Sequence, residues 1–234
     1  MKKVFNYFTL TEKIILSVSI LIITLTFLIF DRKGYFNYVA SIIGVVSLIL
    51  NAKGNFIGQI IGIIFCTCYG IISFTYRYYG EVITYLCMTM PFAIISMISW
   101  IKNPFKNKKT EVTINNVKGI ELFYILPIVL LITFGFYFIL KYFNTANLLI
   151  STISIATSTI AVYFTFRRSP YFALAYSIND LVLIVLWLLA SIDNIIYISV
   201  VGCFISFFIN DIYGYIAWKR MYNKQQKELN ETKF

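Results

Sequence analysis

Residues 122–143 read LFYILPIVLLITFGFYFILKYF, an apolar and aromatic run with a single charge near its end. A helix of about 20 apolar residues is long enough to cross a hydrocarbon core of roughly 30 Å. Seven further stretches resemble it, and the eight spans are 14–30, 36–51, 55–77, 82–101, 122–143, 147–166, 170–190 and 195–218. The sequence therefore predicts an all-α integral membrane protein with eight transmembrane helices.

Basic residues are distributed unequally between the two sides of these helices. Of the 20 Lys and Arg residues, 16 fall at the two termini and in the loops after the second, fourth and sixth helices. The other side carries Arg32, Lys33, Arg77 and Lys141. Because positive loops stay in the cytoplasm, we expect a multi-pass protein of the inner (plasma) membrane with both termini cytoplasmic. The net charge of +10 then faces the headgroups of the lipid bilayer and requires no nucleic-acid partner.

Composition narrows the possible chemistry. The chain has 59% hydrophobic and 13% charged residues, and it contains no His. Without His, the Ser-His-Asp, Cys-His and HExxH arrangements of enzymes are excluded. The four Cys lie inside predicted helices, where Cys66 and Cys68 point in different directions and cannot chelate one ion together. We therefore expect no enzyme activity, no metal site and no cofactor.

The fourth and eighth helices end alike, which suggests an internal duplication. Residues 95–102 read ISMISWIK and residues 213–220 read YGYIAWKR, so each has a Trp followed by cations. Two parallel three-helix units with one helix between them form a 3+1+3 transporter architecture of the SWEET type, with the substrate between the halves. The alternative is that Trp and cations mark any cytoplasmic helix end.

The duplication divides the chain into five segments. These are an N-terminal cytoplasmic segment with an extra transmembrane helix (1–35), the first repeat (36–101), a basic loop with a linker helix (102–146), the second repeat (147–218) and a cytoplasmic tail (219–234).

Several motifs from residue 36 onward stand at defined spacings. They are Arg77-Tyr78-Tyr79-Gly80-Glu81, Pro91 nine residues before Trp100, the Arg167-Arg168 pair, Asn179, and Gly214-Tyr215 before Trp218. In these motifs the chain resembles the PnuC family of nicotinamide riboside transporters. This resemblance implies facilitated diffusion of a vitamin precursor without a phosphate, which is trapped afterwards by phosphorylation in the cytoplasm. It also implies a homotrimer.

The sequence departs from the family pattern at positions that are expected to face the substrate. Where many members carry Asn, Gly and Trp, this chain has Ala93, Ser96 and Met97, and where many have two Trp it has Phe172 and Ala175. Another vitamin, such as thiamine or riboflavin, is therefore an alternative substrate. A small polytopic membrane enzyme acting on lipid and a scaffold subunit are alternatives of a different class.

Two acid-amide pairs lie within the predicted membrane, where ionisable groups are functional candidates by default. Asn179-Asp180 lies about 14 Å from the cytoplasmic end of the seventh helix, and Asn210-Asp211 lies about 10 Å from that of the eighth, so the pairs share a depth. Carboxylates would offset a pyridinium charge, Asn would bind a carboxamide or ribose, and aromatic rings would stack. Alternatively, these side chains hydrogen-bond neighbouring helices or pair with Arg167 or Arg168.

Residues on the same helix faces complete the candidate site. The candidate substrate-binding residues are Asn179, Asp180, Asn210, Asp211, Tyr176, Trp187, Tyr85, Thr89, Trp100 and Tyr215. Glu81 and Arg77 are expected to form an exposed ion pair in an outer loop, and residues 102–109 are expected to form a solvated linker. Gly58 and Gly62 predict close helix packing.

Overall fold

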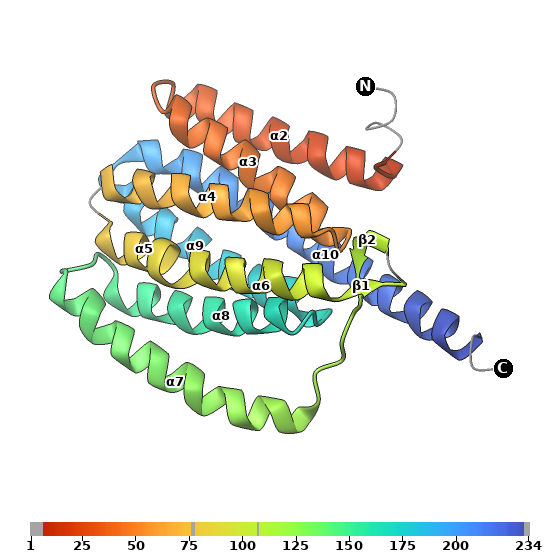
Figure 1. The fold of residues 1–234 in the computed structure, drawn as a ribbon. Helices are drawn as coiled ribbons and strands as arrows, with labels where there is room; N and C mark the ends of the chain where they lie inside the picture. Colours follow the sequence, from red (N-terminus) through yellow and green to blue (C-terminus); the bar gives the residue numbers. More distant parts are fainter. Residues whose placement is uncertain (1–6, 76–77, 107, 232–234) are drawn as a thin grey trace.

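The computed structural model describes residues 7–75, 78–106 and 108–231 and is almost entirely helical (Figure 1). Its elements are α2 (Leu10–Phe30), α3 (Tyr35–Ala52), α4 (Phe56–Thr75), α5 (Tyr79–Ile83), a π-helical segment (Thr84–Thr89), α6 (Met90–Lys102), β1 (Pro104–Phe105), β2 (Lys108–Val112), α7 (Gly119–Tyr142), α8 (Leu148–Phe166), α9 (Tyr171–Asp193), a 3-10 turn (Ile195–Tyr197) and α10 (Ile198–Glu231). In this described part of the chain, eight helices are long and apolar enough to cross a membrane. The predicted all-α membrane fold is confirmed.

Six of the helices form a closed ring. Helix α3 packs on α4, α4 on α6, α6 on α8, α8 on α9, α9 on α10, and α10 back on α3. Helix α2 lies outside the ring against α10 and α3, and α7 lies outside it against α8, as Figure 1 shows. The two outer helices are therefore placed alike, because each precedes and contacts the first helix of a three-helix unit.

Two tryptophans join the three-helix units in equivalent ways. The Trp100 indole N–H, from α6, donates a hydrogen bond to the Thr165 carbonyl at 3.0 Å. The Trp218 indole N–H, from α10, donates to the Asn51 carbonyl at 2.8 Å. Both acceptors lie one residue before the end of a helix, where backbone carbonyls lack partners within the helix. The third helix of each unit thus binds the end of the first helix of the other unit.

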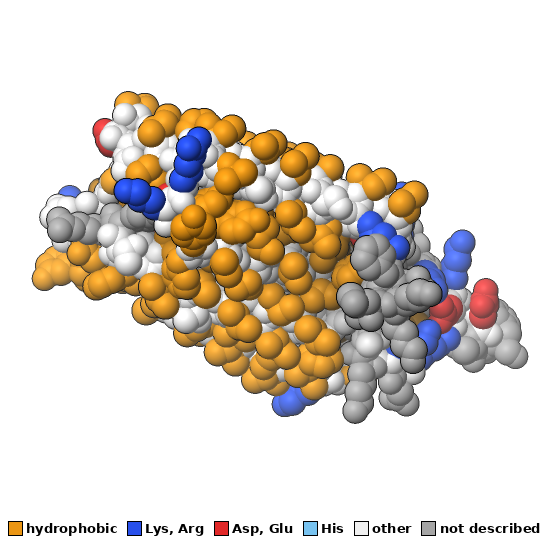
Figure 2. Space-filling view, turned by 90° about the horizontal axis from the view of Figure 1, so that it is seen from above, with side chains coloured by type: hydrophobic (Ala, Val, Ile, Leu, Met, Phe, Trp, Pro, Cys, Tyr) orange, Lys and Arg blue, Asp and Glu red, His pale blue; other side chains and the backbone are white. Residues whose placement is uncertain are grey.

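Helix α2 begins and helix α10 ends at the same end of the bundle (Figure 1). Loops and helix ends there carry Lys53, Lys102 and Arg167, and we call this the basic end. The other end, where α2 meets α3 and α4 meets α5, is called the opposite end. Between them, exposed side chains are mostly apolar, and Figure 2 shows one face on which charges gather mainly toward the ends.

At the basic end, β1 and β2 form an antiparallel hairpin that packs on α10. The Gln225 side chain, only 1% exposed, accepts a hydrogen bond from the Ile114 amide at 2.9 Å and donates to Glu111 and to the Val112 carbonyl at 3.0 Å each. The expectation of a solvated linker at residues 102–109 is therefore wrong in part, because Phe105 is buried. Helix α10 continues through the tail to Glu231.

Candidate functional site

A cavity lies inside the ring of six helices. Together with its opening it has about 890 Å³ of empty volume, and every helix of the ring contributes to its lining. The polar lining residues are Ser47, Asn51, Gln59, Glu81, Thr84, Tyr85, Thr89, Ser154, Ser158, Tyr176, Asn179, Asp180 and Asp211. The other lining residues are Gly44, Leu48, Gly62, Phe65, Cys66, Ala93, Phe172, Leu183, Phe204 and Phe207. Among these described residues there are three acids and neither Lys nor Arg.

Helix α9 supplies the longest polar face of the cavity. It begins directly after Pro170, and Tyr176, Asn179, Asp180 and Leu183 line the cavity at helical spacing. The Thr157 hydroxyl, from α8, donates to Asn179 Oδ1 at 2.8 Å. Because this bond occupies the amide oxygen, the Asn179 amide nitrogen is left as a donor for a ligand.

Asp180 and Asp211 face each other from neighbouring helices. Their carboxyl groups lie close enough to interact, and the two residues are 3% and 5% exposed. Asp180 Oδ2 has no hydrogen-bond partner in the described part of the chain. Neighbouring buried carboxylates repel each other, so a cation or a proton between them stabilises the pair.

The arginines proposed as alternative partners for these acids bind elsewhere. Arg167 forms an ion pair with Glu121 at 2.7 Å, and the Arg168 guanidinium lies 3.4 Å from the Ser99 hydroxyl. Ion pairing of the acids with Arg167 or Arg168 does not occur in this structure. Asp180 and Asp211 therefore line the cavity without either arginine as a partner.

Glu81 lies in the cavity lining, and the expectation of an exposed loop position is wrong. It belongs to α5 and is 2% exposed, and its Oε2 atom has no hydrogen-bond partner among the residues that the structure describes. Arg77, its expected ion-pair partner, lies outside the described residues. The predicted helix started at residue 82, whereas α5 starts at Tyr79, and this difference of one turn moves Glu81 inside.

Tyr85 and Thr89 line the cavity from the π-helical segment between α5 and α6. A π-helical turn is rare and is found frequently at functional sites, because the extra residue redirects the side chains around it. Here it turns the Tyr85 ring toward Tyr69, with centroids 4.4 Å apart, and toward Phe65 at 6.1 Å. The Phe65 and Tyr85 rings line the cavity, and Tyr69 packs beside them.

A chain of polar side chains on α3 and α4 also reaches the cavity. Gln59 donates to Asn51 Oδ1 at 2.9 Å, and the Ser47 hydroxyl donates to the Gly58 carbonyl at 2.8 Å. A Cβ atom at Gly58 would overlap Asn51, and one at Gly62 would lie 3.1 Å from Ser47, which agrees with the predicted close packing. Ser47, Asn51 and Gln59 were not among the predicted site residues, although Ser47 and Asn51 share one face of a predicted helix.

Four of the ten candidate residues lie outside the cavity lining. Asn210 points to α2, where its amide donates to the Ser19 hydroxyl at 2.8 Å. Trp100 packs against Trp218 and Phe172 at the basic end, and Tyr215 packs against Tyr171. The remaining residue, Trp187, packs among aromatic residues at the opposite end.

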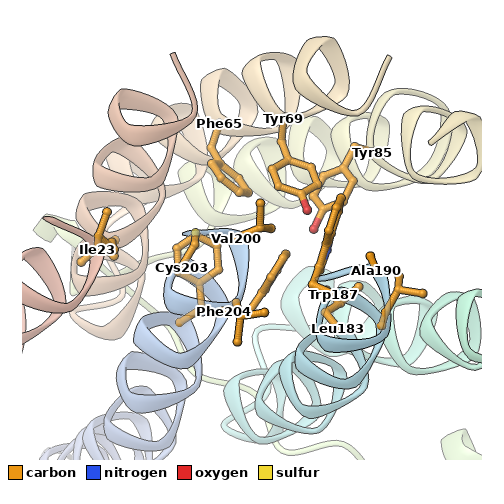
Figure 3. Packing of buried hydrophobic residues seen from close by; sticks show 14 of the residues in the cluster. Ile23, Phe65, Tyr69, Tyr85, Leu183, Trp187, Ala190, Val200, Cys203 and Phe204 are labelled. Carbon is orange, nitrogen blue, oxygen red and sulfur yellow. The ribbon is translucent and has the colours of Figure 1, made fainter. Parts of the chain in front are cut away.

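Aromatic residues pack together toward both ends of the bundle. At the basic end, Phe172 lies 4.7 Å from Trp218 and 6.2 Å from Trp100, measured between ring centroids. At the opposite end, Trp187 contacts Tyr69, Tyr78 and Tyr197. Figure 3 shows Tyr69 and Tyr85 directed toward Trp187. No group of three or more acids and cysteines among the described residues could hold a metal ion.

Comparison with known proteins relates this cavity to a transporter family. The family model described as nicotinamide mononucleotide transporter matches residues 34–220. The nicotinamide riboside transporter PnuC of Neisseria mucosa is 22% identical over 198 residues, which cover 82% of this chain and 75% of that protein. A crystal structure of the vitamin B3 transporter PnuC has the same fold, with a TM-score of 0.80 and 18% identity over 93% of this chain and 94% of that chain.

Proposed function

We propose that this chain, which belongs to the family described as nicotinamide mononucleotide transporters, carries nicotinamide riboside across a membrane. The resemblance that the sequence motifs indicated is confirmed by the match to the family model. The chain is a multi-pass membrane protein, and its family and fold are those of a transporter rather than an enzyme.

The charge of the cavity supports the riboside over the mononucleotide. Glu81, Asp180 and Asp211 line it, and no Lys or Arg does so among the described residues. Nicotinamide riboside carries a positive pyridinium ring and no phosphate, whereas the mononucleotide adds a negative phosphate. Because charges interact strongly in a site with a low dielectric constant, buried carboxylates attract the ring and repel the phosphate.

The lining residues have the chemistry to bind this substrate. Asp180 and Asp211 would offset the positive charge of the ring, and the free amide nitrogen of Asn179 would donate to the carboxamide oxygen. Tyr176 and Tyr85 would lie against the faces of the ring, where a cation is attracted to the π electrons. Ala93 and Phe172, where the family often has larger polar or aromatic residues, also line the cavity and would alter its shape.

Transport by facilitated diffusion, trapping by phosphorylation in the cytoplasm and assembly as a homotrimer are further parts of the proposal, and the family resemblance supports them. We place the protein in the inner (plasma) membrane with the basic end in the cytoplasm. The excess of Lys and Arg at that end, where α2 begins and α10 ends, supports this orientation.

Uptake into liposomes tests the proposal. Purified protein in liposomes is expected to equilibrate radiolabelled nicotinamide riboside without ATP and to exclude the mononucleotide. Empty liposomes give the background rate, and thiamine, which is also a cation, serves as a competitor that tests selectivity. Transport of the mononucleotide at the rate of the riboside would contradict the proposed site chemistry, and preferred transport of thiamine would contradict the proposed substrate.

A further inference from the structure

Glu81 lines the cavity, and Tyr69 and Trp187 pack behind the lining next to it, where several buried polar atoms lack hydrogen-bond partners in the described part of the chain. Glu81 Oε2 and the Tyr69 hydroxyl have none among the described residues, although both residues are 2% exposed. The Trp187 indole N–H faces the Tyr69 hydroxyl without a hydrogen bond of good geometry. Most buried polar groups in proteins are paired, so several unpaired atoms in one place indicate a missing ligand or water.

These atoms come together from three helices. Glu81 is on α5, Tyr69 on α4 and Trp187 on α9, and the Tyr69 ring lies 6.3 Å from the Trp187 ring. Figure 3 shows the hydroxyl groups of Tyr69 and Tyr85 on the side of Trp187. Tyr85 lies close enough to both Glu81 and Asp180 to interact with their charges. The group is therefore connected to the Asp180–Asp211 pair through the cavity wall.

The separation of the two polar regions suits a nucleoside. Trp187 follows Asp180 by seven residues on α9, which is about 10 Å along the helix axis. This distance is comparable to the length of a nucleoside from the far edge of its base to its sugar hydroxyls. One ligand could therefore contact the aspartate pair with its base and Glu81 with its sugar.

We propose that Glu81, with Tyr69 and Trp187 beside it, forms a sugar subsite that binds the ribose hydroxyl groups while Asp180 and Asp211 hold the charged ring. The assignment rests on the proposed function. A carboxylate accepts hydrogen bonds from two neighbouring hydroxyl groups, and the phenol and indole groups provide donors and flat faces against the sugar. A 5′-phosphate on the same ribose would lie close to the Glu81 carboxylate, which gives a local reason for its exclusion.

Two ligands with the same positive ring separate the sugar subsite from the ring subsite. 1-Methylnicotinamide, which is methylated on the ring nitrogen and is therefore a pyridinium cation, has a methyl group in place of the ribose of nicotinamide riboside. Binding of both ligands to purified protein is measured by calorimetry for wild type and for Glu81→Gln. Loss of the Glu81 charge weakens both ligands through the same long-range attraction, so the ratio of their affinities cancels this effect and reports contacts with the sugar alone.

The subsite predicts a lower ratio of the affinity for nicotinamide riboside to the affinity for the methyl analogue. This ratio is expected to fall about tenfold in Glu81→Gln, because a charged hydrogen-bond acceptor becomes a neutral one. Tyr69→Phe removes only a hydroxyl group and is expected to lower the ratio two- to fivefold. Asp180→Asn is expected to weaken both ligands and to leave the ratio unchanged. Glu121→Gln makes the same change outside the cavity lining, in a residue paired with Arg167, and should alter neither affinity.

An unchanged ratio in both Glu81→Gln and Tyr69→Phe would overturn the sugar subsite while the proposed function stands. Wild-type protein that binds neither ligand would instead contradict the proposed function, and the sugar subsite with it.

Discussion

The carboxyl groups of Asp180 and Asp211 dominate the chemistry of the cavity at the residue scale. They are buried, they lie beside each other, and no described Lys or Arg side chain lines the cavity with them. A group of this kind is costly to keep in a membrane protein unless it binds something. In the proposed function the bound group is the positive ring of the substrate.

Replacing one of these acids with its amide keeps its size and removes its charge. We expect Asp180→Asn and Asp211→Asn each to lower the affinity for nicotinamide riboside several-fold, with the fold intact, because one attraction to the positive ring is lost. Binding isotherms and melting curves measure the two effects separately. Asp193→Asn, on the same helix as Asp180 but exposed at its end, is the matched control and should change neither. Lower melting temperatures with unchanged affinity would mean that the acids only join helices.

Neighbouring polar residues show how far sequence alone could locate the site. Asn210 and Asp211 are about 100° apart around α10, so they cannot face the same direction. The pattern identified both residues, but the position of α2 decides which one faces the cavity, and helical periodicity does not place α2. Glu81 was missed for a different reason, since hydropathy locates helix ends only to within a few residues and one turn decides its burial.

At the scale of elements, α2 is attached to the ring by polar contacts at several depths. Asn210 donates to the Ser19 hydroxyl at 2.8 Å near the middle of the helix. Near the basic end, Glu12 binds Lys53 at 3.0 Å and accepts a hydrogen bond from Tyr213 at 3.2 Å. The family model starts at residue 34, so α2 lies outside the matched region. These contacts indicate that α2 stabilises α10 and α3 from outside the cavity.

Asn210 is therefore expected to affect stability rather than binding. Asn210→Ala removes the bond to Ser19 and should lower the free energy of unfolding by roughly 0.6–1.7 kcal/mol, the range for hydrogen bonds between membrane helices. Melting curves should shift downward while the affinity for nicotinamide riboside stays the same. Ser19→Ala removes the same bond from the side of α2 and should give a similar shift. A loss of affinity without a change in melting temperature would show that Asn210 contacts the substrate in another conformation.

The element boundaries were predicted to different accuracy for physical reasons. Residues 36–51 were predicted as a span, and α3 runs Tyr35–Ala52, because a continuous apolar run determines a membrane helix. The hairpin at residues 104–112 was not predicted, since its charged sequence resembles a solvated loop. Its position depends on Gln225, more than 100 residues later, and no local pattern reveals such a contact.

At the scale of the whole molecule, two similar helix ends in the sequence predicted a duplication. In the structure the two tryptophans at these ends make equivalent contacts, because Trp100 and Trp218 each bind a backbone carbonyl at the end of a helix in the other unit. The ring closes through these two equivalent junctions, and the cavity forms between the units. A transporter with this symmetry exposes its site by moving one unit relative to the other, as alternating access requires.

Facilitated diffusion of a cation through such a ring makes transport sensitive to the membrane potential. Nicotinamide riboside carries one positive charge, and a potential of 100 mV is worth about 2.3 kcal/mol per charge, or roughly a fifty-fold concentration ratio. We therefore expect proteoliposomes with an inside-negative membrane potential, set by a potassium gradient and valinomycin, to accumulate the riboside. Liposomes at zero potential should only equilibrate it. Accumulation that ignores the potential but follows a pH gradient would mean that a proton replaces the substrate at the Asp180–Asp211 pair, and would contradict simple facilitated diffusion.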